Sequence, residues 1–450
     1  MQKDPYLLTA DTVRESPVSF SERLKFLGPG FILSASIVGS GELIATTALG
    51  ARAGFVAFWV IVVSCLIKVA IQLEFGRTAI LHGHTPMKLF GLLPGRGKWA
   101  VWTVFILTLL KVIQVGGMLG GSSLVLYQLF PFVPLVVWAL FLAILVALLI
   151  FKNYYKLIER ASLIMVALFT VFTLVSLFAV NFTEFNFTWQ DVLSGLQFHL
   201  PANTVIVAIA AFGITGVASD EIIAYNYWCI EKGYASYTGP FENTDAWRQR
   251  ARGWIRVMQL DAVVAMIIYT MVTAAFYLLG AAILYGRSSL ADGNELVMVL
   301  AEIYTKTLGS GVRLIYLVGA FFVLFSSVFA TLAYWTRLFP DVFGELGWLD
   351  FSNHRKRKQT IAWLSWLFPL LWLVAFFFIR LPMIMILTGG LVGSVLLLLV
   401  AYAAVWFRYV KNIRLQQSAT RDMLLWLSVV SIAVIGVYGL IKILFPSYLP

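Results

Sequence analysis

The sequence predicts an all-α integral membrane protein with about eleven transmembrane helices. Of its 450 residues, 60% are hydrophobic and only 12% are charged, whereas a typical soluble domain is about half apolar and a quarter charged. Apolar runs long enough to cross about 30 Å of hydrocarbon, at about 1.5 Å per helical residue, recur along the chain. A soluble fold cannot hide so much apolar surface, so the lipid bilayer is the expected partner.

The expected spans follow one another and leave no room for a globular domain. They cover residues 28–50, 54–80, 99–129, 133–151, 160–180, 200–230, 255–285, 311–336, 361–380, 383–407 and 423–445. Together they form a single transmembrane domain, 28–445, behind a polar tail at 1–27. The two cysteines, Cys65 and Cys229, lie in apolar runs, which argues against a disulfide framework or a cysteine-based zinc site.

The combined number of lysine and arginine residues is alternately high and low from one loop to the next. If the N-terminus is cytoplasmic, 25 of the 33 basic residues lie in inside segments, six in outside segments and two within spans. This asymmetry follows the positive-inside rule and predicts a multi-pass protein of the cell (inner) membrane, with its N-terminus in the cytoplasm and its C-terminus outside. The net charge of +11 then faces anionic lipid, and no nucleic-acid partner is expected.

Two spans are interrupted by glycine and polar residues at mid-depth. The first contains Gly39, Ser40, Gly41 and Glu42, and the sixth contains Gly216, Val217, Ser219, Asp220 and Glu221. Glycine weakens a helix, and freed backbone groups survive in lipid only where they line a protein cavity. Matching breaks in two halves are typical of inverted-repeat transporters with a site at the membrane midplane. The repeats are then spans 1–5 (about 28–180) and 6–10 (about 200–407), and 423–445 is an additional helix.

The three carboxylates at these breaks require a physical reason, because a charged side chain at bilayer depth costs about 2.5 kcal/mol or more. They either bind a cation or pair with the buried Lys68 and Lys111, and Asp220 has the further option of capping a half-helix. Carboxylates, hydroxyls and free carbonyls form a hard oxygen site. We therefore expect Glu42 and Glu221 to be the charged metal ligands. The expected shell is completed by Gly39, Ser40, Gly41, Gly216, Val217, Ser219 and Asp220.

Four other polar residues within spans are candidates for supporting or coupling roles. Lys111 and Gln114 share a face of the third span, where Lys111 either neutralises a site carboxylate or snorkels to the interface. Lys68 is expected in a structural ion pair, and Asp261 relays protons, caps a helix or pairs with Arg256. The sequence contains no phosphate-binding loop, zinc-protease helix or nucleophile elbow, so we expect neither an enzyme nor a cofactor beyond the transported cation.

Three segments resemble the natural resistance-associated macrophage protein (Nramp) family of divalent-metal transporters. They are Gly28-Pro29-Gly30-Phe31 with the later Ala45-Thr46, the run Gly213-Ile214-Thr215-Gly216-Val217-Ala218-Ser219, and Phe325-Ser326-Ser327 with the later Thr331-Leu332-Ala333. The resemblance covers the eleven-span layout and most of the chain. It implies a leucine-transporter-like fold with broken helices 1 and 6, cation transport and alternating access.

The sequence departs from the family pattern at the metal site itself. The family's metal-binding Asp corresponds to Gly39, its Pro to Ser40 and its Asn to Glu42, while its Met and His correspond to Val217 and Ser219. By this alignment the thioether is lost and the carboxylate is shifted by three residues. The resemblance therefore does not carry manganese or iron specificity to this chain, and a harder ion such as Mg²⁺ or Mn²⁺ is favoured.

The leading prediction is a monomeric secondary active transporter that moves a divalent metal cation inward by alternating access. One alternative keeps the fold and the carboxylates, but the substrate is a small organic cation or an amino-acid-like solute. The other alternative is a membrane sensor or scaffold that transports nothing.

Overall fold

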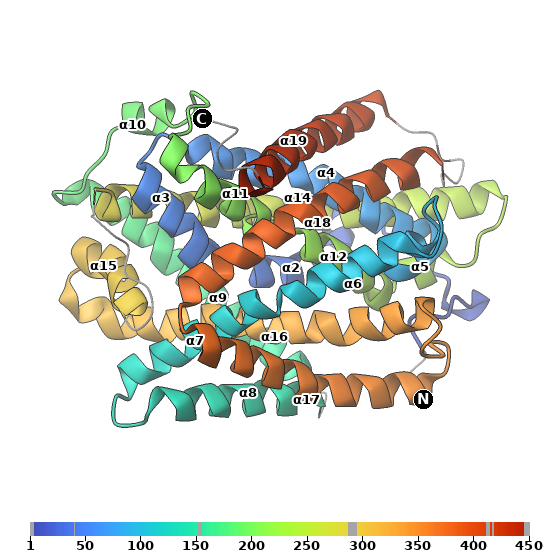
Figure 1. Ribbon diagram of the computed structural model, residues 1–450. Coiled ribbons are helices and arrows are strands. Elements are labelled where there is room, and N and C mark those ends of the chain that lie inside the picture. Colours follow the sequence, from blue (N-terminus) through green and yellow to red (C-terminus); the bar gives the residue numbers. More distant parts are fainter. Residues whose placement is uncertain are drawn as a thin grey trace.

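The protein is an all-helical bundle, seen here in a computed structural model that describes residues 4–39, 41–151, 155–286, 295–410, 415 and 418–444 (Figure 1). The predicted fold class is confirmed. Among the residues that the structure describes, eight helices are long and apolar enough to cross a membrane, and shorter apolar helices cover Leu135–Phe151 and Val166–Phe182. The broken first span completes the expected set of eleven. Each of its halves is too short to cross a bilayer alone.

The first five spans correspond to helices in the expected order. The broken first span is α2 (Pro29–Ile37), a π-helical turn (Gly41–Thr46) and α3 (Thr47–Ala53). The next four are α4 (Phe58–His82), α6 (Trp99–Leu110) continued by α7 (Val112–Leu129), α8 (Leu135–Phe151) and α9 (Tyr155–Ala179). Span three is therefore divided at Lys111, which ends α6.

The remaining six spans follow the same pattern. They are α11 (Val205–Ile214) with α12 (Ser219–Lys232), α14 (Asp245–Leu284), α16 (Arg313–Glu345), α17 (His354–Ile379), α18 (Pro382–Tyr409) and α19 (Ala419–Leu444). The narrow predicted boundary between spans nine and ten is correct. Arg380 ends α17 in the left-handed conformation, and Pro382 occupies the first turn of α18, where its missing N–H costs nothing.

The two halves of the chain interlock around the broken helices. Helix α14 packs against α2, α3 and α4, and α11 packs against α18. Helices α8 and α17 lie side by side on one flank of the bundle, and α19 covers the opposite flank (Figure 1). A Cβ at Gly213 would collide with the carbonyl oxygen of Gly390, so glycine permits the close crossing of α11 and α18.

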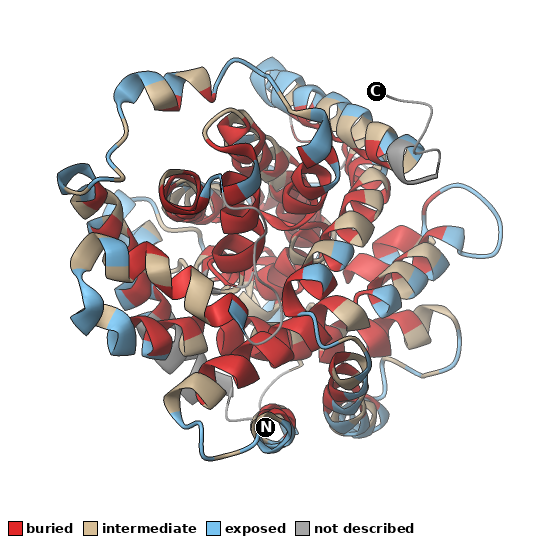
Figure 2. Cartoon of the chain, turned by 60° about the vertical axis from the view of Figure 1, so that its left-hand side comes forward, coloured by how far each residue is buried: buried red, intermediate tan, exposed pale blue. Residues whose placement is uncertain are grey.

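Burial separates the interior of the bundle from its lipid-facing surface. Buried residues gather in the middle of the bundle (Figure 2). Large apolar side chains remain exposed on its outer helices, among them Leu168, Phe378 and Val434. Exposed apolar side chains of this kind are expected where lipid replaces water.

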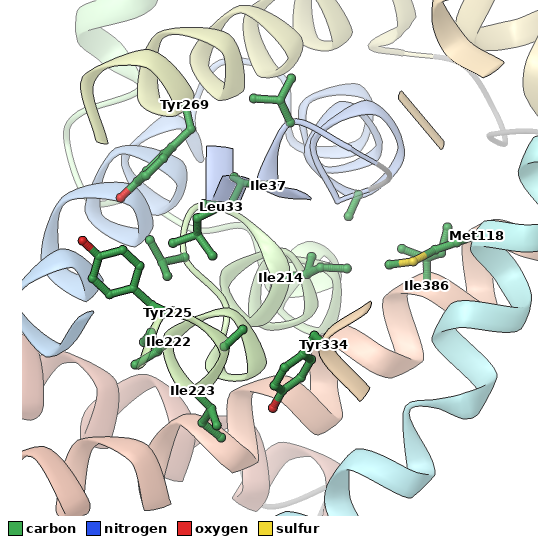
Figure 3. Close-up of a cluster of buried hydrophobic side chains, with 14 of the residues drawn as sticks. Leu33, Ile37, Met118, Ile214, Ile222, Ile223, Tyr225, Tyr269, Tyr334 and Ile386 are labelled. Atoms are coloured by element: carbon green, nitrogen blue, oxygen red, sulfur yellow. The ribbon is translucent and has the colours of Figure 1, made fainter. Parts of the chain in front are cut away.

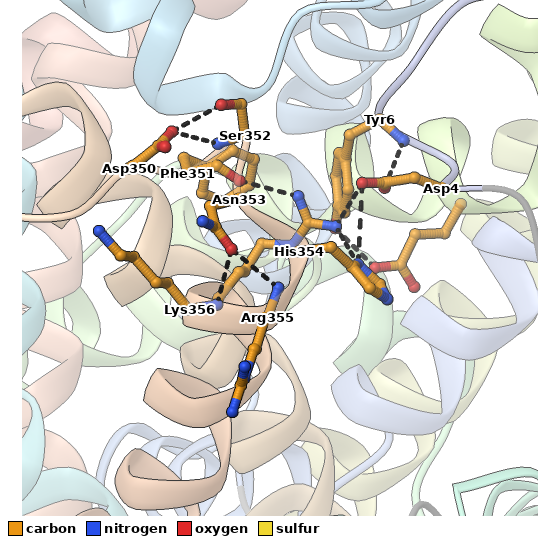
Figure 4. A network of polar contacts seen from close by, with 11 residues as sticks. Asp4, Tyr6, Asp350, Phe351, Ser352, Asn353, His354, Arg355 and Lys356 are labelled. Atoms are coloured by element: carbon orange, nitrogen blue, oxygen red, sulfur yellow. Dashed lines mark hydrogen bonds and ion pairs between the residues drawn. The ribbon is translucent and has the colours of Figure 1, made fainter.

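The N-terminal tail differs from the simple polar extension that was predicted, because it is docked on the bundle. The tail includes α1 (Phe20–Leu24). Asp4 forms an ion pair of 2.6 Å with Arg357, and the ring of Tyr6 packs edge-on against Phe351 (Figure 4). Further along, the indole N–H of Trp254 donates to the carbonyl of Arg14 at 3.0 Å. We call the end of the bundle that carries this tail the tail end.

Short helices complete the loops. They are α5 (Pro86–Gly91), α10 (Trp189–Ser194), α13 (Tyr234–Thr238) and α15 (Leu296–Leu308). Helix α14 begins ten residues before its predicted span. Half of the additional residues are charged or polar, so a search for apolar runs misses this segment.

Candidate functional site

The first helix break lies between α2 and the π-helical turn. Helix α2 ends at Ile37, and the N–H of Leu43 donates to the carbonyl of Gly39 at 3.0 Å across the break. A Cβ at Gly39 would collide with the Ser327 hydroxyl on α16. Glycine is therefore required here because a neighbouring helix approaches the backbone closely. Ser40, a predicted ligand, lies outside the described residues.

The second break separates α11 from α12. Gly216 has φ of +62°, a left-handed conformation that glycine adopts without strain. The carboxylate of Glu221 accepts the N–H of Ala218 at 2.6 Å and so caps α12 from within its first turn. The cap considered for Asp220 is thus provided by its neighbour, and the Asp220 side chain points elsewhere.

Lys68 closes the free end of α11. Its buried ammonium donates to the carbonyl of Thr215 at 2.7 Å and to that of Phe212 at 2.5 Å. It also lies 4.7 Å from the centroid of the Phe212 ring. These carbonyls are the exposed negative end of a helix dipole. Among the described residues, Lys68 therefore binds backbone oxygens instead of forming the expected ion pair.

Glu42 joins the two breaks to each other. One of its carboxylate oxygens accepts the N–H of Gly216 at 3.1 Å and the hydroxyl of Thr273 at 3.2 Å. Its second oxygen, Oε2, has no hydrogen-bond partner among the described residues, and the side chain is fully buried. Glu42 does not line the cavity described next, so of the two expected charged ligands only Glu221 lies in its wall.

A cavity of about 70 Å³ begins at the breaks and extends toward the tail end. Helices α2, α7, α12 and α16 form its wall, and Leu33, Ile37, Met118, Ile214 and Tyr334 are among its apolar lining (Figure 3). Its polar lining comprises Ser36, Gln114, Asp220, Glu221, Ser326, Ser327 and Thr331. Ser36 donates to Glu221 at 3.4 Å. The amide oxygen of Gln114 is buried without a hydrogen-bond partner in the described part of the chain.

Only some predicted residues reach this cavity. Gly41, Gln114, Asp220 and Glu221 line it, whereas the other described residues of the expected shell lie behind its wall. Ser36 and Ser327 also line the cavity, and the sequence analysis did not predict them there. Two features of the sequence could have indicated them. Ser36 lies one turn before the first break, and Ser327 belongs to the small-residue segment of α16.

Asp220 is paired with Lys111 across the cavity wall. The ammonium lies 2.5 Å from a carboxylate oxygen, and the side chains are 3% and 16% exposed. Of the two roles considered for Lys111, neutralisation of a site carboxylate matches this geometry. Among the described residues, no three His, Cys, Asp or Glu side chains converge to hold a metal ion. A cation in the cavity would therefore meet two carboxylates and otherwise neutral oxygens.

The tail end of the cavity is bordered by an ion-pair cluster of Tyr6, Glu231 and Arg337. Arg337 contacts both carboxylate oxygens of Glu231, at 2.6 and 2.9 Å, and the Tyr6 hydroxyl donates to Glu231 at 2.7 Å. The guanidinium also lies over the ring of Trp228, a cavity residue, at 4.7 Å. A bidentate arginine pair of this kind fixes α12 against α16.

Asp261 anchors the first half-helix. Its carboxylate accepts the N–H groups of Gly28 and Gly30, at 2.8 and 2.5 Å, and the hydroxyl of Tyr225 at 3.2 Å. Two of the N–H groups at the start of α2 are thus satisfied from α14. Of the roles considered for Asp261, capping matches these contacts; Arg256 is not among its hydrogen-bond or ion-pair partners in the described structure.

Replacing Asp261 with Asn should lower the thermal stability of the purified protein. An amide offers one acceptor where the carboxylate offers two, and a buried donor left without a partner costs about 1–3 kcal/mol. The measurement is the melting temperature in detergent, with the exposed Glu242→Gln as the matched control. Equal melting temperatures for both variants would mean that Asp261 does not anchor α2.

Comparisons with known proteins relate the whole chain to membrane transporters. The profile of the family described as natural resistance-associated macrophage protein-like (Nramp) matches residues 30–444. Two curated relatives are named divalent metal cation transporter MntH. The protein from Caldanaerobacter subterraneus is 23% identical over 62% of this chain and 63% of its own length. The protein from Levilactobacillus brevis is 24% identical over 59% and 56%. Each match thus spans less than two thirds of the relative.

Solved structures share the fold at low sequence identity. A manganese transporter from Eremococcus coleocola superposes with a TM-score of 0.68 at 12% identity, covering 98% of this chain and 93% of that one. Mhp1, a nucleobase-cation-symport-1 family transporter with bromovinylhydantoin bound, gives 0.57 at 14%, covering 96% and 93%. MhsT with L-phenylalanine gives 0.55 at 15%, covering 95% and 100%. The leucine-transporter-like fold is therefore confirmed, and these likenesses extend to architecture alone.

Proposed function

This chain belongs to the Nramp family, and from that premise we propose that it is a secondary active transporter of a divalent metal cation. The observation that carries the proposal is the cavity at the two helix breaks, where Asp220 and Glu221 face an otherwise neutral wall. Ionisable groups at such depth are typical of an ion pathway. The names of the two curated relatives favour the same substrate class.

The proposed ligands are chiefly oxygen atoms. Asp220 and Glu221 supply the charge, and the hydroxyls of Ser36 and Ser327 and the amide oxygen of Gln114 complete the shell. Oxygen ligands favour hard ions such as Mg²⁺ or Mn²⁺. Glu42 then stabilises the break instead of binding the ion directly, since its carboxylate bonds to Gly216 and Thr273.

Alternating access requires the cavity to open in turn toward each side. We assign the tail end to the cytoplasm, which places the C-terminus outside. We also propose that the protein lies in the cell membrane and acts as a monomer. Release to the cytoplasm then needs α2 and α12 to move away from α16. The cluster of Tyr6, Glu231 and Arg337 opposes that movement and is the proposed inner closure.

Met118 adds a thioether to the cavity that the motif comparison did not anticipate. A soft sulfur ligand favours Mn²⁺ over Mg²⁺. Replacing Met118 with Leu, which conserves volume, should reduce Mn²⁺ uptake and leave Mg²⁺ uptake unchanged. The measurement is the ratio of the two uptake rates in proteoliposomes. An unchanged ratio would remove Met118 from the ligand set.

The experiment that tests the proposed function is uptake into proteoliposomes across a panel of divalent cations, with internal pH monitored. Saturable uptake of at least one divalent cation, absent from protein-free liposomes, is expected. Acidification of the interior during uptake would identify protons as the coupled ion. Absence of flux for every solute tested would favour the sensor or scaffold alternative.

A second substrate class is favoured by the aromatic lining of the cavity. Trp228 and Tyr334 line it near the carboxylates. Aromatic faces beside carboxylates suit an ammonium group on a small organic solute. The two substrate classes, metal ions and organic cations, are separated by measuring whether metal ions and amines inhibit each other's uptake. Inhibition by an amine without inhibition by Mg²⁺ or Mn²⁺ would establish the organic cation.

A further inference from the structure

A second hollow, of about 500 Å³, lies at the tail end and is separate from the transport cavity. The tail contributes Ser16 and Arg23 to its wall, and the polar start of α14 contributes Asp245, Arg248, Arg252 and Arg256. We call it the arginine hollow. The three α14 arginines follow each other at four-residue intervals, so they lie on one face of the helix.

Much of the positive charge in the arginine hollow is not neutralised. Arg248 is paired with Asp245 at 2.8 Å, and Arg23 donates to the carbonyl of Val18 at 3.0 Å. Arg252 and Arg256 are exposed and form no ion pair or hydrogen bond with any residue that the structure describes. Four guanidinium groups and one carboxylate leave a formal charge of +3. Arginine forks are suited to bidentate binding of phosphate oxygens.

The position of the hollow along α14 places it near the membrane surface. Helix α14 has 40 residues and is about 60 Å long, twice the thickness of the hydrocarbon core. Its residues from Val257 onward are mainly apolar, whereas the turns before it carry the arginines. Arg252 and Arg256 thus lie at the border between the spanning and the polar parts of the helix, which is where lipid headgroups are found.

We propose that the arginine hollow binds a phosphoryl anion, specifically the headgroup of an anionic phospholipid. The net charge, the unpaired guanidinium groups and the place at the membrane border all favour this ligand. A free phosphorylated solute has the same chemistry but does not depend on the membrane border, so the two sources are separated by experiment below.

The bound headgroup would fasten the tail to the helix that holds the first half-helix. A Cβ at Gly253 would collide with the Ser16 hydroxyl, so the tail lies directly on α14 at this hollow. Eight residues further along α14, Asp261 binds the first residues of α2. An anion bridging Arg23 and the α14 arginines therefore restrains the segment that leads into α2. This consequence for transport rests on the proposed function, whereas the binding itself does not.

The test is a thermal-shift titration of the full-length protein in neutral detergent. The probes are phosphatidylglycerol, phosphatidylcholine and inorganic phosphate, added separately. The test variant is Arg252→Gln/Arg256→Gln, and the matched control is Arg355→Gln/Lys358→Gln, which removes two exposed charges on α17. Unchanged size-exclusion profiles and lipid-free melting temperatures show that both variants are folded.

Phosphatidylglycerol is expected to stabilise the wild type and the control, and phosphatidylcholine is expected to have no such effect. The apparent affinity of the test variant for phosphatidylglycerol should fall roughly 30-fold, because a basic residue near an anionic surface contributes about 1 kcal/mol. Equal thermal-shift responses of the test and control variants to phosphatidylglycerol would refute the proposed binding site. Equal responses to inorganic phosphate and to phosphatidylglycerol would overturn the lipid as the ligand. Neither result depends on whether the protein transports a metal.

Discussion

Replacing Glu221 with Gln should abolish cation uptake while the protein still folds. Glu221 lines the cavity, and removing a charged contact costs about 1.5–3 kcal/mol, which weakens binding roughly 10- to 150-fold. Gln retains a side-chain oxygen for the N–H of Ala218, so the cap of α12 survives. The measurement is uptake in proteoliposomes together with the affinity of the purified protein for Mn²⁺ and Mg²⁺.

The Glu42→Gln variant is the control for this prediction. Glu42 is fully buried behind the wall and bonds to Gly216 and Thr273. The Glu42→Gln variant should therefore bind the cation within a few-fold of the wild type and be altered mainly in stability and transport rate. The opposite pattern, lost binding in Glu42→Gln and normal binding in Glu221→Gln, would restore Glu42 as the principal ligand.

Replacing Lys111 with Met should make the protein depend on the cation for its stability. In the structure Lys111 neutralises Asp220, so a divalent ion that binds Asp220 must displace a tethered ammonium group. Without Lys111, Asp220 is left as a nearly buried charge, at a cost of about 3–5 kcal/mol. The variant should melt at lower temperature in metal-free buffer, recover when Mg²⁺ or Mn²⁺ is added, and bind these ions more tightly than the wild type.

The double variant Lys111→Met/Asp220→Asn is the control for that prediction. It removes both charges, so no unpaired carboxylate remains for the metal to stabilise. Its melting temperature should be near that of the wild type and should respond to metal less than that of Lys111→Met. If Lys111→Met is no more sensitive to metal than the wild type, the ion pair does not compete with the transported cation.

The fold could be predicted from the sequence because lipid imposes a simple requirement. Each span needs about 20 apolar residues, and each unwound segment needs a protected position, so composition and glycine patterns indicated both spans and breaks. The family resemblance is confirmed by the profile that matches residues 30–444. The docked tail and the polar start of α14 were not predicted, because they are held by individual polar contacts such as Trp254 with Arg14.

The site could be predicted only to the level of the two breaks. Once a helix unwinds, its 3.6-residue period no longer says which way a side chain points. Glu42 and Glu221 each follow a glycine-containing break, yet Glu221 faces the cavity and Glu42 does not. Lys68 shows a related limit, since its partners are backbone carbonyls at the end of α11, and sequence patterns favour charged partners over backbone ones. The ligand roles of these residues remain predictions.

The central claim is that a divalent cation binds in the cavity between the broken helices. Anomalous diffraction from crystals soaked in Mn²⁺ tests it most directly. The proposal predicts a single strong anomalous peak within coordination distance, about 2.0–2.6 Å, of Asp220 or Glu221 and of at least one of Ser36, Gln114 and Ser327. It also predicts that the peak disappears in Glu221→Gln. A peak at Glu42 away from the cavity, or no peak at Mn²⁺ concentrations that saturate uptake, would contradict it.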